Sequence, residues 1–414
     1  MESKVEKILK SMETTGKGFY SLLGIFGLLV LWGAYAWYTQ FTVGMQTTGL
    51  NDTVMWGLYI ATFMFMIGVS HAGIIISTSI RVGKIEKLKP IARISEAMTI
   101  AGLAMAVLSV VADIGRPDRI FVLFFNLRVT SPLAWDLIIL SLYFAFSAFY
   151  LLISTKHDLH SLVDRFDMRG SLYKFLGGIQ NAITPKEDKA YHNMLHTVSA
   201  ILLPFPLLDS GMVVAFIFSL LGARPALNVP YIGPYFLLTA IVTGIAAIVI
   251  VSYLLTKAYD WDDVIPEETI TELAKYLKVG IPLVLYFIFN QHFTFQYVGK
   301  LSTLVVSNML LLQGRHALLF WEMIIVGFIL PEILLFTPNI KKDRLFFASI
   351  MTTLGLWVNC ILIVVPALSF PNLPFNWGTY SPTWVEWSII AGVTALGVLI
   401  FTVLTKLIPI VELE

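Results

Sequence analysis

The 414-residue chain is 57% hydrophobic and only 13% charged, with a mean hydropathy of +0.79, whereas soluble domains carry about 25% charged residues. This composition excludes an ordinary soluble domain and indicates an integral membrane protein. The 28 Lys and Arg residues nearly balance the 27 Asp and Glu residues, for a net charge of +1. The total charge therefore gives no reason to expect a nucleic-acid partner.

Apolar runs of about 20 residues predict membrane-spanning helices, because an α-helix needs this length to cross the hydrocarbon core. Segment 1–18 is polar and has no small-residue cleavage site, so we expect a cytoplasmic tail followed by a retained first span. In chain order the predicted spans are 19–41, 54–80, 90–112, 132–155, 194–222, 234–256, 276–298, 315–338, 344–369 and 384–408. The seventh is the least regular, because Lys275 and Lys278 crowd its start and the stretch after it is a candidate interfacial helix.

These spans predict an all-α integral membrane protein with ten transmembrane helices. We expect one four-helix bundle at 54–222 and a second at 234–369, an arrangement common among membrane carriers. A peripheral span at 19–41 and a last span with the C-terminal tail at 384–414 flank the bundles. The polar connection 156–193 is too short to form a domain of its own.

Charged residues in the connections predict the orientation of the chain. The N-terminal tail and the second and fourth connections are rich in Lys and Arg, whereas the first and ninth connections carry none. Because Lys and Arg favour the cytoplasmic side, both termini are expected in the cytoplasm. The third connection opposes this bias with Arg116, Arg119 and Arg128 on the outer side, which suggests that they dock a partner or close a pocket.

Ionisable side chains inside predicted spans cost about 2.5–3.5 kcal/mol each at a helix centre and therefore indicate function. His71 lies in the second span, Asp113 ends the third and Asp136 begins the fourth. Each also has a structural explanation. His71 suits a hydrogen bond in a small-residue packing face, Asp113 a turn at Gly115-Arg116-Pro117, and Asp136 a favourable position at a helix N-terminus.

Two further groups are candidates for a proton path. Arg93 and Glu96, at the start of the third span, are three residues apart on one helix face and are expected to pair, either as a structural ion pair or as a proton entry. Asp209 lies just after two prolines in the fifth span and has no partner nearby in the sequence. Glu322, in the eighth span, is a weaker candidate of the same kind.

Pro204 and Pro206, inside the fifth span, predict a break in the helical hydrogen-bond ladder. At membrane depth the freed backbone groups must be satisfied by protein or water, since lipid offers no partners.

We expect no metal centre in this chain. Its single cysteine, Cys360, lies in an apolar run and cannot by itself hold an iron–sulfur cluster. His192 and His196 lie four residues apart on one helix face, but haem ligation in a bundle uses histidines from facing helices. Motifs for phosphate binding, nucleophilic catalysis or zinc-dependent hydrolysis are absent from the sequence.

Five stretches resemble one membrane protein family. They are MWGLYIATFMFMIGVSHAGIIIS, RISEAMTI, DIGRPDRI, SPLAWDLIILSLYF and YSPTWVEW, the last at residues 380–387. Together they resemble the NrfD/PsrC family of polysulfide reductase membrane subunits. The length of ten spans is similar to the longer branch, which contains the membrane subunits of alternative complex III and of the Dsr complex.

The resemblance implies a quinone-binding membrane anchor in the cytoplasmic membrane. A menaquinone-type or other quinone would bind at its outer side and exchange electrons with an extracytoplasmic iron–sulfur subunit, itself joined to a molybdopterin catalytic subunit. The matching motif positions are His71, Glu96, Arg116 and Asp136. The polar quinone ligands of the shorter subunits fall near Tyr59 and Phe63, where this sequence departs from the family pattern.

The resulting hypothesis is a quinone-reactive subunit of a respiratory complex that acts on a sulfur compound. His71, Asp113, Arg116 and Asp136 are assigned to quinone and proton handling, with Arg119 and Arg128 in partner docking. The chain would carry the quinone redox site without acting on the terminal substrate. Two alternatives stay open: a proton- or ion-coupled secondary transporter, in which the broken helices form the substrate site, and a structural anchor with no quinone.

Overall fold

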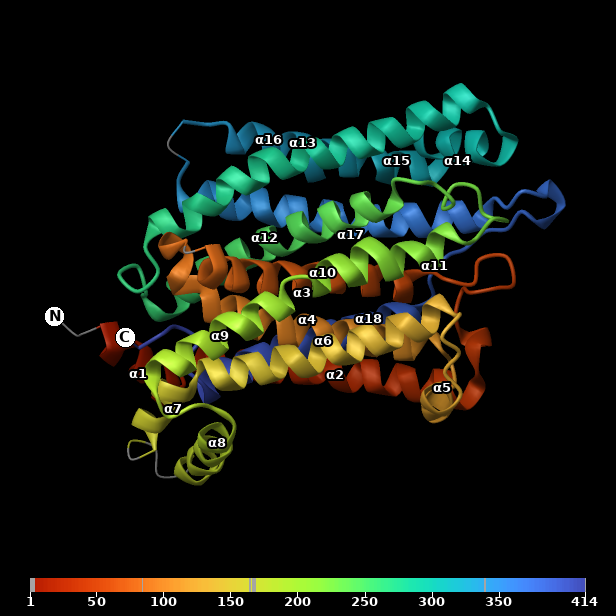
Figure 1. Cartoon of the computed structure of the whole chain (residues 1–414). Coiled ribbons are helices and arrows are strands. Elements are labelled where there is room, and N and C mark those ends of the chain that lie inside the picture. Colours follow the sequence, from red (N-terminus) through yellow and green to blue (C-terminus); the bar gives the residue numbers. More distant parts are fainter. Residues whose placement is uncertain (1–3, 84, 164, 166–168, 339, 414) are drawn as a thin grey trace.

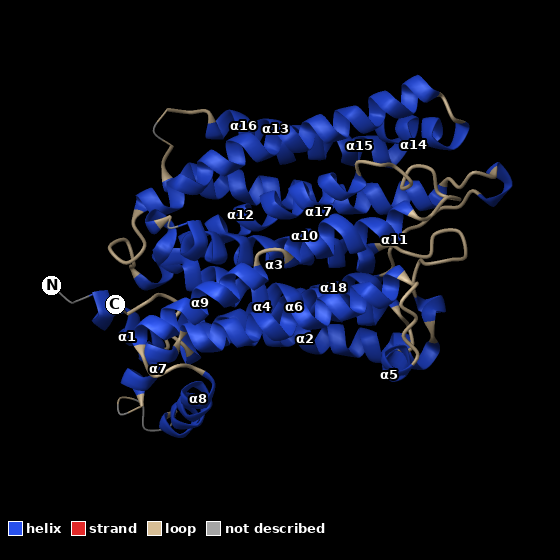
Figure 2. Ribbon diagram, viewed as in Figure 1, coloured by secondary structure: helices blue, strands red, loops and turns tan. Residues whose placement is uncertain are grey.

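The computed structural model describes residues 4–413 except 84, 164, 166–168 and 339. All regular elements within this part of the chain are helices (Figure 2). The long ones are α2 (Lys17–Val43), α3 (Leu58–Gly83), α4 (Ala92–Asp113), α6 (Pro132–Ser154), α12 (Ile232–Tyr259), α13 (Glu267–Val298), α17 (Lys342–Ser369) and α18 (Trp384–Leu407). Two further spans are interrupted: α9 (Asp188–Leu202), α10 (Phe205–Leu208), η4 (Asp209–Val214) and α11 (Ala215–Ser219) form one, and α15 (Gly314–Glu322), η5 (Met323–Ile329) and α16 (Leu330–Leu335) form the other. The all-α membrane architecture predicted from the sequence is confirmed.

Nine described helices are long and apolar enough to cross a membrane, and each coincides with a predicted span. The predicted span 276–298 falls in α13, which has the required length but is less apolar. Asn290, Gln291, His292 and Gln296 interrupt its second half. The candidate interfacial segment after it forms α14 (Leu301–Leu311), a short apolar helix that packs on α13 and α15. Its interfacial position stays a prediction.

Helix α3 lies at the centre of the molecule. It packs against α4 and α9 on one side and against α12 and α17 on the other. In the first half of the chain α4 and α6 complete the group around α3 and α9, and in the second half α12, α13, α16 and α17 pack together (Figure 1). Helix α2 is mostly exposed and packs on α18, which in turn packs on α4. The division into bundles at 54–222 and 234–369 stays a prediction.

Glycine permits the close contact between α2 and α18. A Cβ atom at Gly33 would lie 2.7 Å from the Cα of Gly392, which is closer than packed atoms approach one another. Small residues at such crossings let the two backbones meet, and van der Waals packing then holds the helices together in lipid.

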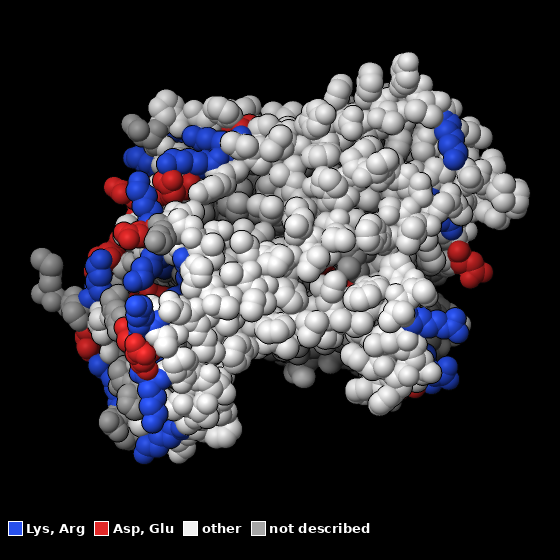
Figure 3. All heavy atoms as spheres, viewed as in Figure 1, with Lys and Arg blue, Asp and Glu red and all other residues white. Residues whose placement is uncertain are grey.

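The two chain ends lie together (Figure 1). We call this end of the molecule, with residues 4–13 and 408–413, the terminal end. Lys406 donates to the backbone oxygens of Ser11 and Thr14, which ties α18 to α1 (Lys4–Glu13). Charged atoms crowd the terminal end and are sparse at the opposite end, with an uncharged band between (Figure 3). Such a band is the surface that a lipid bilayer would cover.

The polar connection 156–193 forms two helices at the terminal end. They are α7 (Lys156–Leu162) and α8 (Gly170–Ile183), and α7 packs against α8 and α6.

Candidate functional site

A buried histidine and a buried aspartate meet between α3 and η4. The Nε2 atom of His71 lies 3.3 Å from Oδ2 of Asp209, and both side chains are fully buried. His71 is 14th of the 26 residues of α3, at the middle of a span. The sequence indicated both residues separately but gave no sign that they meet.

The local backbone around Asp209 explains its position. Pro204 and Pro206 lack the N–H groups that a continuous helix needs, and α9 accordingly ends at Leu202. After the short helix α10, the chain enters the π-helical segment η4 at Asp209. The predicted break at the prolines is therefore confirmed. Single-turn π-helical segments are frequent at functional sites.

The phenol of Tyr143 on α6 borders this pair. Its hydroxyl donates to the backbone oxygen of Ser70 at 3.1 Å, and its ring centroid lies 5.5 Å from that of His71. Asp136, seven residues earlier on α6, is buried on the same helix face as Tyr143. Neither oxygen of Asp209 has a hydrogen-bond partner among the described residues. The cluster therefore has unused capacity to bind and pass protons.

Tyr143 was missed from the sequence, although a signal for it exists. Polar residues recur along α6 at Asp136, Tyr143, Ser147, Tyr150 and Ser154, three to seven residues apart and all buried. This spacing places them on one helix face. A buried polar stripe on an apolar helix is expensive in lipid and indicates function in the same way as a buried charge.

The small residues beside His71 serve helix packing. A Cβ atom at Gly73 would lie 2.4 Å from both the Ser95 backbone oxygen and Oγ1 of Thr99, so glycine lets α3 approach α4. On the α4 side the backbone of the neighbouring helix fills the space beside these residues, so no ligand can approach His71 from that side.

A cavity of about 980 Å³ lies near the opposite end, between α3, α4, α6 and α11. Most of its lining is apolar, with Trp56, Phe63, Leu140 and Phe218 among the larger side chains. Two acids reach it: Asp113 from the end of α4 and Asp136 from the start of α6. One carboxylate oxygen of each has no hydrogen-bond partner among the described residues. Figure 3 shows acidic atoms in a hollow of the otherwise uncharged band.

Asp136 connects this cavity to the buried pair. It lines the cavity and lies on the same face of α6 as Tyr143, which borders the His71–Asp209 pair. His71 itself does not line the cavity. Of the four residues assigned to quinone and proton handling, the structure therefore places Asp113 and Asp136 at the cavity and His71 outside its lining.

Arg116 lies away from the cavity. It is exposed and pairs with Asp118 at 2.9 Å within the turn after α4. Its hydrogen bonds and charge lower the pKa of Asp118. Arg119 is also exposed, whereas Arg128 lines the mouth of the cavity. This position does not support the assignment of Arg116 to quinone and proton handling.

The expected pairing of Arg93 with Glu96 is wrong. Arg93 instead donates to the carboxylate of Asp158 on α7 and to the Ser154 backbone oxygen, both of which are buried. Glu96 accepts hydrogen bonds from Ser77 and Ser154, each at 2.6 Å. Groups from other helices replace the neighbour three residues away, because Ser77 of α3, Ser154 of α6 and Asp158 of α7 lie against the buried residues of α4.

Glu96 also belongs to a charged chain that leads to the terminal end. Arg81 lies 3.7 Å from Glu96 and 3.3 Å from Glu412 in the C-terminal tail. Burial alone raises the pKa of Glu412, but Arg93, Arg81 and Lys89 lower it overall. The side chain of Arg81 also lies over the ring of Tyr150. The polar stripe on α6 thus meets surface charges at this end.

Glu322 lies outside the site. It is exposed at the end of α15 in the second half of the chain. Asn359, on α17, accepts a hydrogen bond from Tyr235 of α12 at 2.9 Å. No polar connection from either residue to His71 is found among the described residues.

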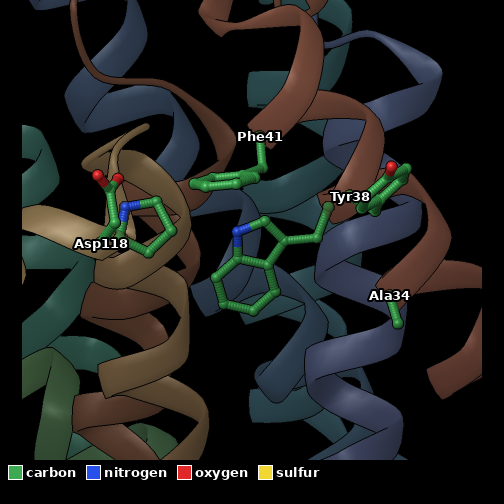
Figure 4. A pocket seen from close by; sticks show the side chains of 6 residues that line it. Ala34, Tyr38, Phe41 and Asp118 are labelled. Carbon is green, nitrogen blue, oxygen red and sulfur yellow. The ribbon is translucent and has the colours of Figure 1, made fainter.

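A second hollow, of about 450 Å³, lies on the outer surface between α2 and the turn at Pro117 (Figure 4). Phe41, Tyr38 and Ala34 line one side and Asp118 the other. It is shallow, and no buried ionisable group among the described residues lines it. Within the described part of the chain, no three His, Cys, Asp or Glu side chains are grouped so that they could hold a metal ion.

Comparison with known proteins gives the family. The sequence model described as "Polysulphide reductase, NrfD" matches residues 46–372. The chain is 26% identical to a putative membrane subunit of a dimethyl sulfoxide reductase of Halobacterium salinarum, over 97% of this chain and 93% of the relative. It is 24% identical to the Hdr-like menaquinol oxidoreductase integral membrane subunit of Archaeoglobus fulgidus, over 97% and 96%. It is also 24% identical to the menaquinone reductase integral membrane subunit of Nitratidesulfovibrio vulgaris, over 92% and 90%. The family match spans most of the ten predicted spans, and the chain belongs to the NrfD polysulphide reductase family.

Proposed function

We propose that this protein is the quinone-reactive membrane subunit of a respiratory oxidoreductase complex in the cytoplasmic membrane. The observation that carries the proposal is the apolar cavity with Asp113 and Asp136 in its wall, lined also by α3 and η4, the two elements that carry the His71–Asp209 pair. An apolar cavity of this size with a few convergent polar groups is typical of a small-molecule site. The names of two relatives, a menaquinol oxidoreductase subunit and a menaquinone reductase subunit, favour a menaquinone-type quinone.

The two acids suit the proton chemistry of a quinone. Oxidation of a quinol releases two protons with two electrons, and reduction of a quinone takes up both. Asp113 and Asp136 each present a carboxylate oxygen without a hydrogen-bond partner among the described residues, and these oxygens would accept or donate the protons. The aromatic and aliphatic lining excludes water and holds the apolar body of the ligand.

Protons would leave the cavity along the buried polar side chains of the first half of the chain. Asp136 would pass a proton to the Asp209–His71 pair, whose carboxylate oxygens and ring nitrogens can hold it. Tyr143, Ser147 and Tyr150 continue the line along α6. It ends at Glu96 and Arg81, next to Glu412 at the terminal end. The same route serves uptake if electrons flow in the other direction.

Electrons must pass to another subunit, because one cysteine cannot hold a cluster. The partners of this chain would be an iron–sulfur subunit and a molybdopterin catalytic subunit, in a complex that acts on a sulfur compound. Relatives are named as subunits of dimethyl sulfoxide and selenate reductases. The exposed guanidinium groups of Arg116 and Arg119, with Arg128 at the cavity mouth, would dock the iron–sulfur subunit beside the quinone site.

The charge distribution supports a terminal end in the cytoplasm. The described basic side chains at the opposite end are Arg116, Arg119, Arg128, Arg224 and Lys300. The remaining described Lys and Arg side chains lie at the terminal end, consistent with the positive-inside bias. This orientation places the cavity in the outer half of the membrane, where an extracytoplasmic subunit would reach it.

The cavity is tested by filling it. Ala104 lines the cavity on α4, so Ala104→Phe is expected to weaken binding of a short-tailed menaquinone analogue at least about tenfold, because the added ring occupies ligand volume. Titration of the purified complex with the analogue measures the change. Ala34→Phe adds the same ring to the shallow hollow of Figure 4 and is the matched control, with unchanged affinity expected. Equal affinities in both variants would place the quinone elsewhere.

The orientation is tested by labelling introduced cysteines in a Cys360→Ser background. Gly49 is a poor probe, since a Cβ atom there would lie 2.1 Å from the Ser381 backbone oxygen. Asp52 is exposed in the same connection, and Asp52→Cys should react with an impermeant maleimide added to whole cells. Ser171→Cys, at the terminal end, should react only after the membrane is opened. The reverse pattern would show that the protein has the opposite orientation in the membrane. The three arginines would then lie on the side away from the expected partner.

An ion-coupled transporter remains the second candidate, favoured by the buried Asp209 at a π-helical break. Such a protein would carry its substrate as this chain alone. Uptake by vesicles that contain only the purified chain, with no quinone bound to it, would support the transporter and contradict our proposal.

A further inference from the structure

Helix α8 is oriented differently from the spans. Figure 1 shows it nearly end-on beside the ends of α6 and α7, while the spans run across the view. Its axis therefore runs across the ends of the spans, and the helix lies at the terminal end of the molecule.

One face of α8 is fixed to the span ends. The hydroxyl of Tyr173 donates to the backbone oxygen of Leu407 at 2.9 Å, and Nε2 of Gln180 donates to that of Leu152 at 2.6 Å. Both side chains are buried. These two contacts, seven residues apart, set the rotation of the helix about its axis.

A second face is apolar and only partly covered, with Leu176 packed against the protein core and the neighbouring Phe175 exposed. Leu172, Phe175, Leu176, Ile179 and Ile183 follow one another at intervals of one to four residues and form a single stripe along the helix. Phe175 is 66% exposed and Leu172 is 40% exposed. A stripe of this kind is unfavourable in water, but it suits a helix that lies in the interface of a bilayer.

The remaining face is polar. Lys174 and Asn181, both exposed, lie on the side of the helix away from the apolar stripe, and Lys186 and Lys189 follow the helix. In Figure 3 the lobe that carries α7 and α8 has basic atoms on its outer edge and uncharged atoms on the side toward the uncharged band. The apolar side of the lobe is thus continuous with the surface that the bilayer covers.

We propose that α8 is an interfacial membrane helix, with its apolar stripe inserted beneath the lipid headgroups and Lys174 on the headgroup side in contact with anionic phospholipid. The continuity of the uncharged surface favours lipid over a protein partner as the occupant. Cationic side chains beside an inserted apolar face add electrostatic attraction to anionic lipid. This role is independent of the quinone site, because none of the described α8 residues lines the cavity.

Fluorescent labels on opposite faces of α8 test the proposal. In a Cys360→Ser background, Phe175→Cys and Asn181→Cys would each carry an environment-sensitive dye, and the full chain would be reconstituted in nanodiscs with phosphatidylglycerol. Iodide should quench the dye at 175 at least about threefold less than the dye at 181, and lipids spin-labelled near the headgroup should quench only the dye at 175. Equal iodide quenching at both positions would overturn the membrane placement. Protection from iodide at 175 without quenching by spin-labelled lipid would show that protein covers the stripe and would also overturn it.

The charge part of the proposal has its own readout. Replacing phosphatidylglycerol by phosphatidylcholine should increase iodide quenching at position 175 about twofold, because part of the attraction to the headgroups is lost. Lys174→Gln should remove most of this dependence on lipid charge. If the dye at 175 responds equally in the two lipids before Lys174 is changed, the preference for anionic lipid is refuted.

Discussion

Replacing His71 by glutamine is expected to lower quinone-linked turnover about 100-fold in a complex that still assembles. A positioned acid or base contributes about 10²–10⁴ to a rate, and His71 is the imidazole that contacts Asp209. Assembly should survive, because the contacts that hold α3 against α4 come from Gly73 and Thr99 and not from the imidazole. Reduction of a menaquinone analogue by the purified complex, normalised to the amount of assembled subunits, measures the effect.

Asp209→Asn should reproduce the loss, because it keeps the size of the side chain and removes its titratable proton. His292 is the matched control. It is a buried histidine on α13, held 3.0 Å from the Ser307 hydroxyl, and it lies outside the proposed route. His292→Gln should leave the rate within about twofold of the parent. If both the His71 and the Asp209 variants turn over at the parental rate, the pair is only a packing contact and has no part in proton transfer.

Replacing Glu386 by alanine is expected to destabilise the fold by about 2–5 kcal/mol, since removal of a buried acceptor leaves its donors unsatisfied at about 1–3 kcal/mol each. Glu386 is fully buried near the start of α18. Its carboxylate accepts from the Gly49 and Thr383 backbone N–H groups at 2.7 and 2.9 Å, and from the Tyr380 hydroxyl at 2.5 Å. Tyr380 in turn accepts from the Leu58 N–H at 2.9 Å. One carboxylate thus joins the starts of α3 and α18 to the first connection.

The melting temperature of the purified protein in detergent measures this loss. Tyr380→Phe keeps the ring and removes only the hydroxyl, so a smaller decrease is expected. Glu322→Ala, at an exposed position, should change the melting temperature by little. An unchanged melting temperature in Glu386→Ala would show that this motif does not hold the helices together.

The membrane architecture and the family could be predicted from the sequence alone. Apolar run length fixes where helices cross, because lipid offers no partner for a free backbone, and nine predicted spans accordingly coincide with nine described helices. The prolines at 204 and 206 predicted the break before Asp209 for a local reason, the missing N–H groups. Ordered motifs around His71, Glu96 and Asp136 indicated the family, because they are strings of residues that can be matched without three-dimensional information.

Which of these residues meet depended on the tertiary structure. His71 and Asp209 are 138 positions apart, and no local pattern could bring them within 3.3 Å. The pairing of Arg93 with Glu96 was argued from helix geometry alone and failed, because Asp158 and the serines of neighbouring helices compete for the same groups. Arg116 was assigned to quinone and proton handling from the resemblance of its motif to the family pattern, yet the turn directs it to Asp118 at the surface. Local spacing determines which face of a helix a side chain occupies, whereas its partners depend on how the helices pack around it.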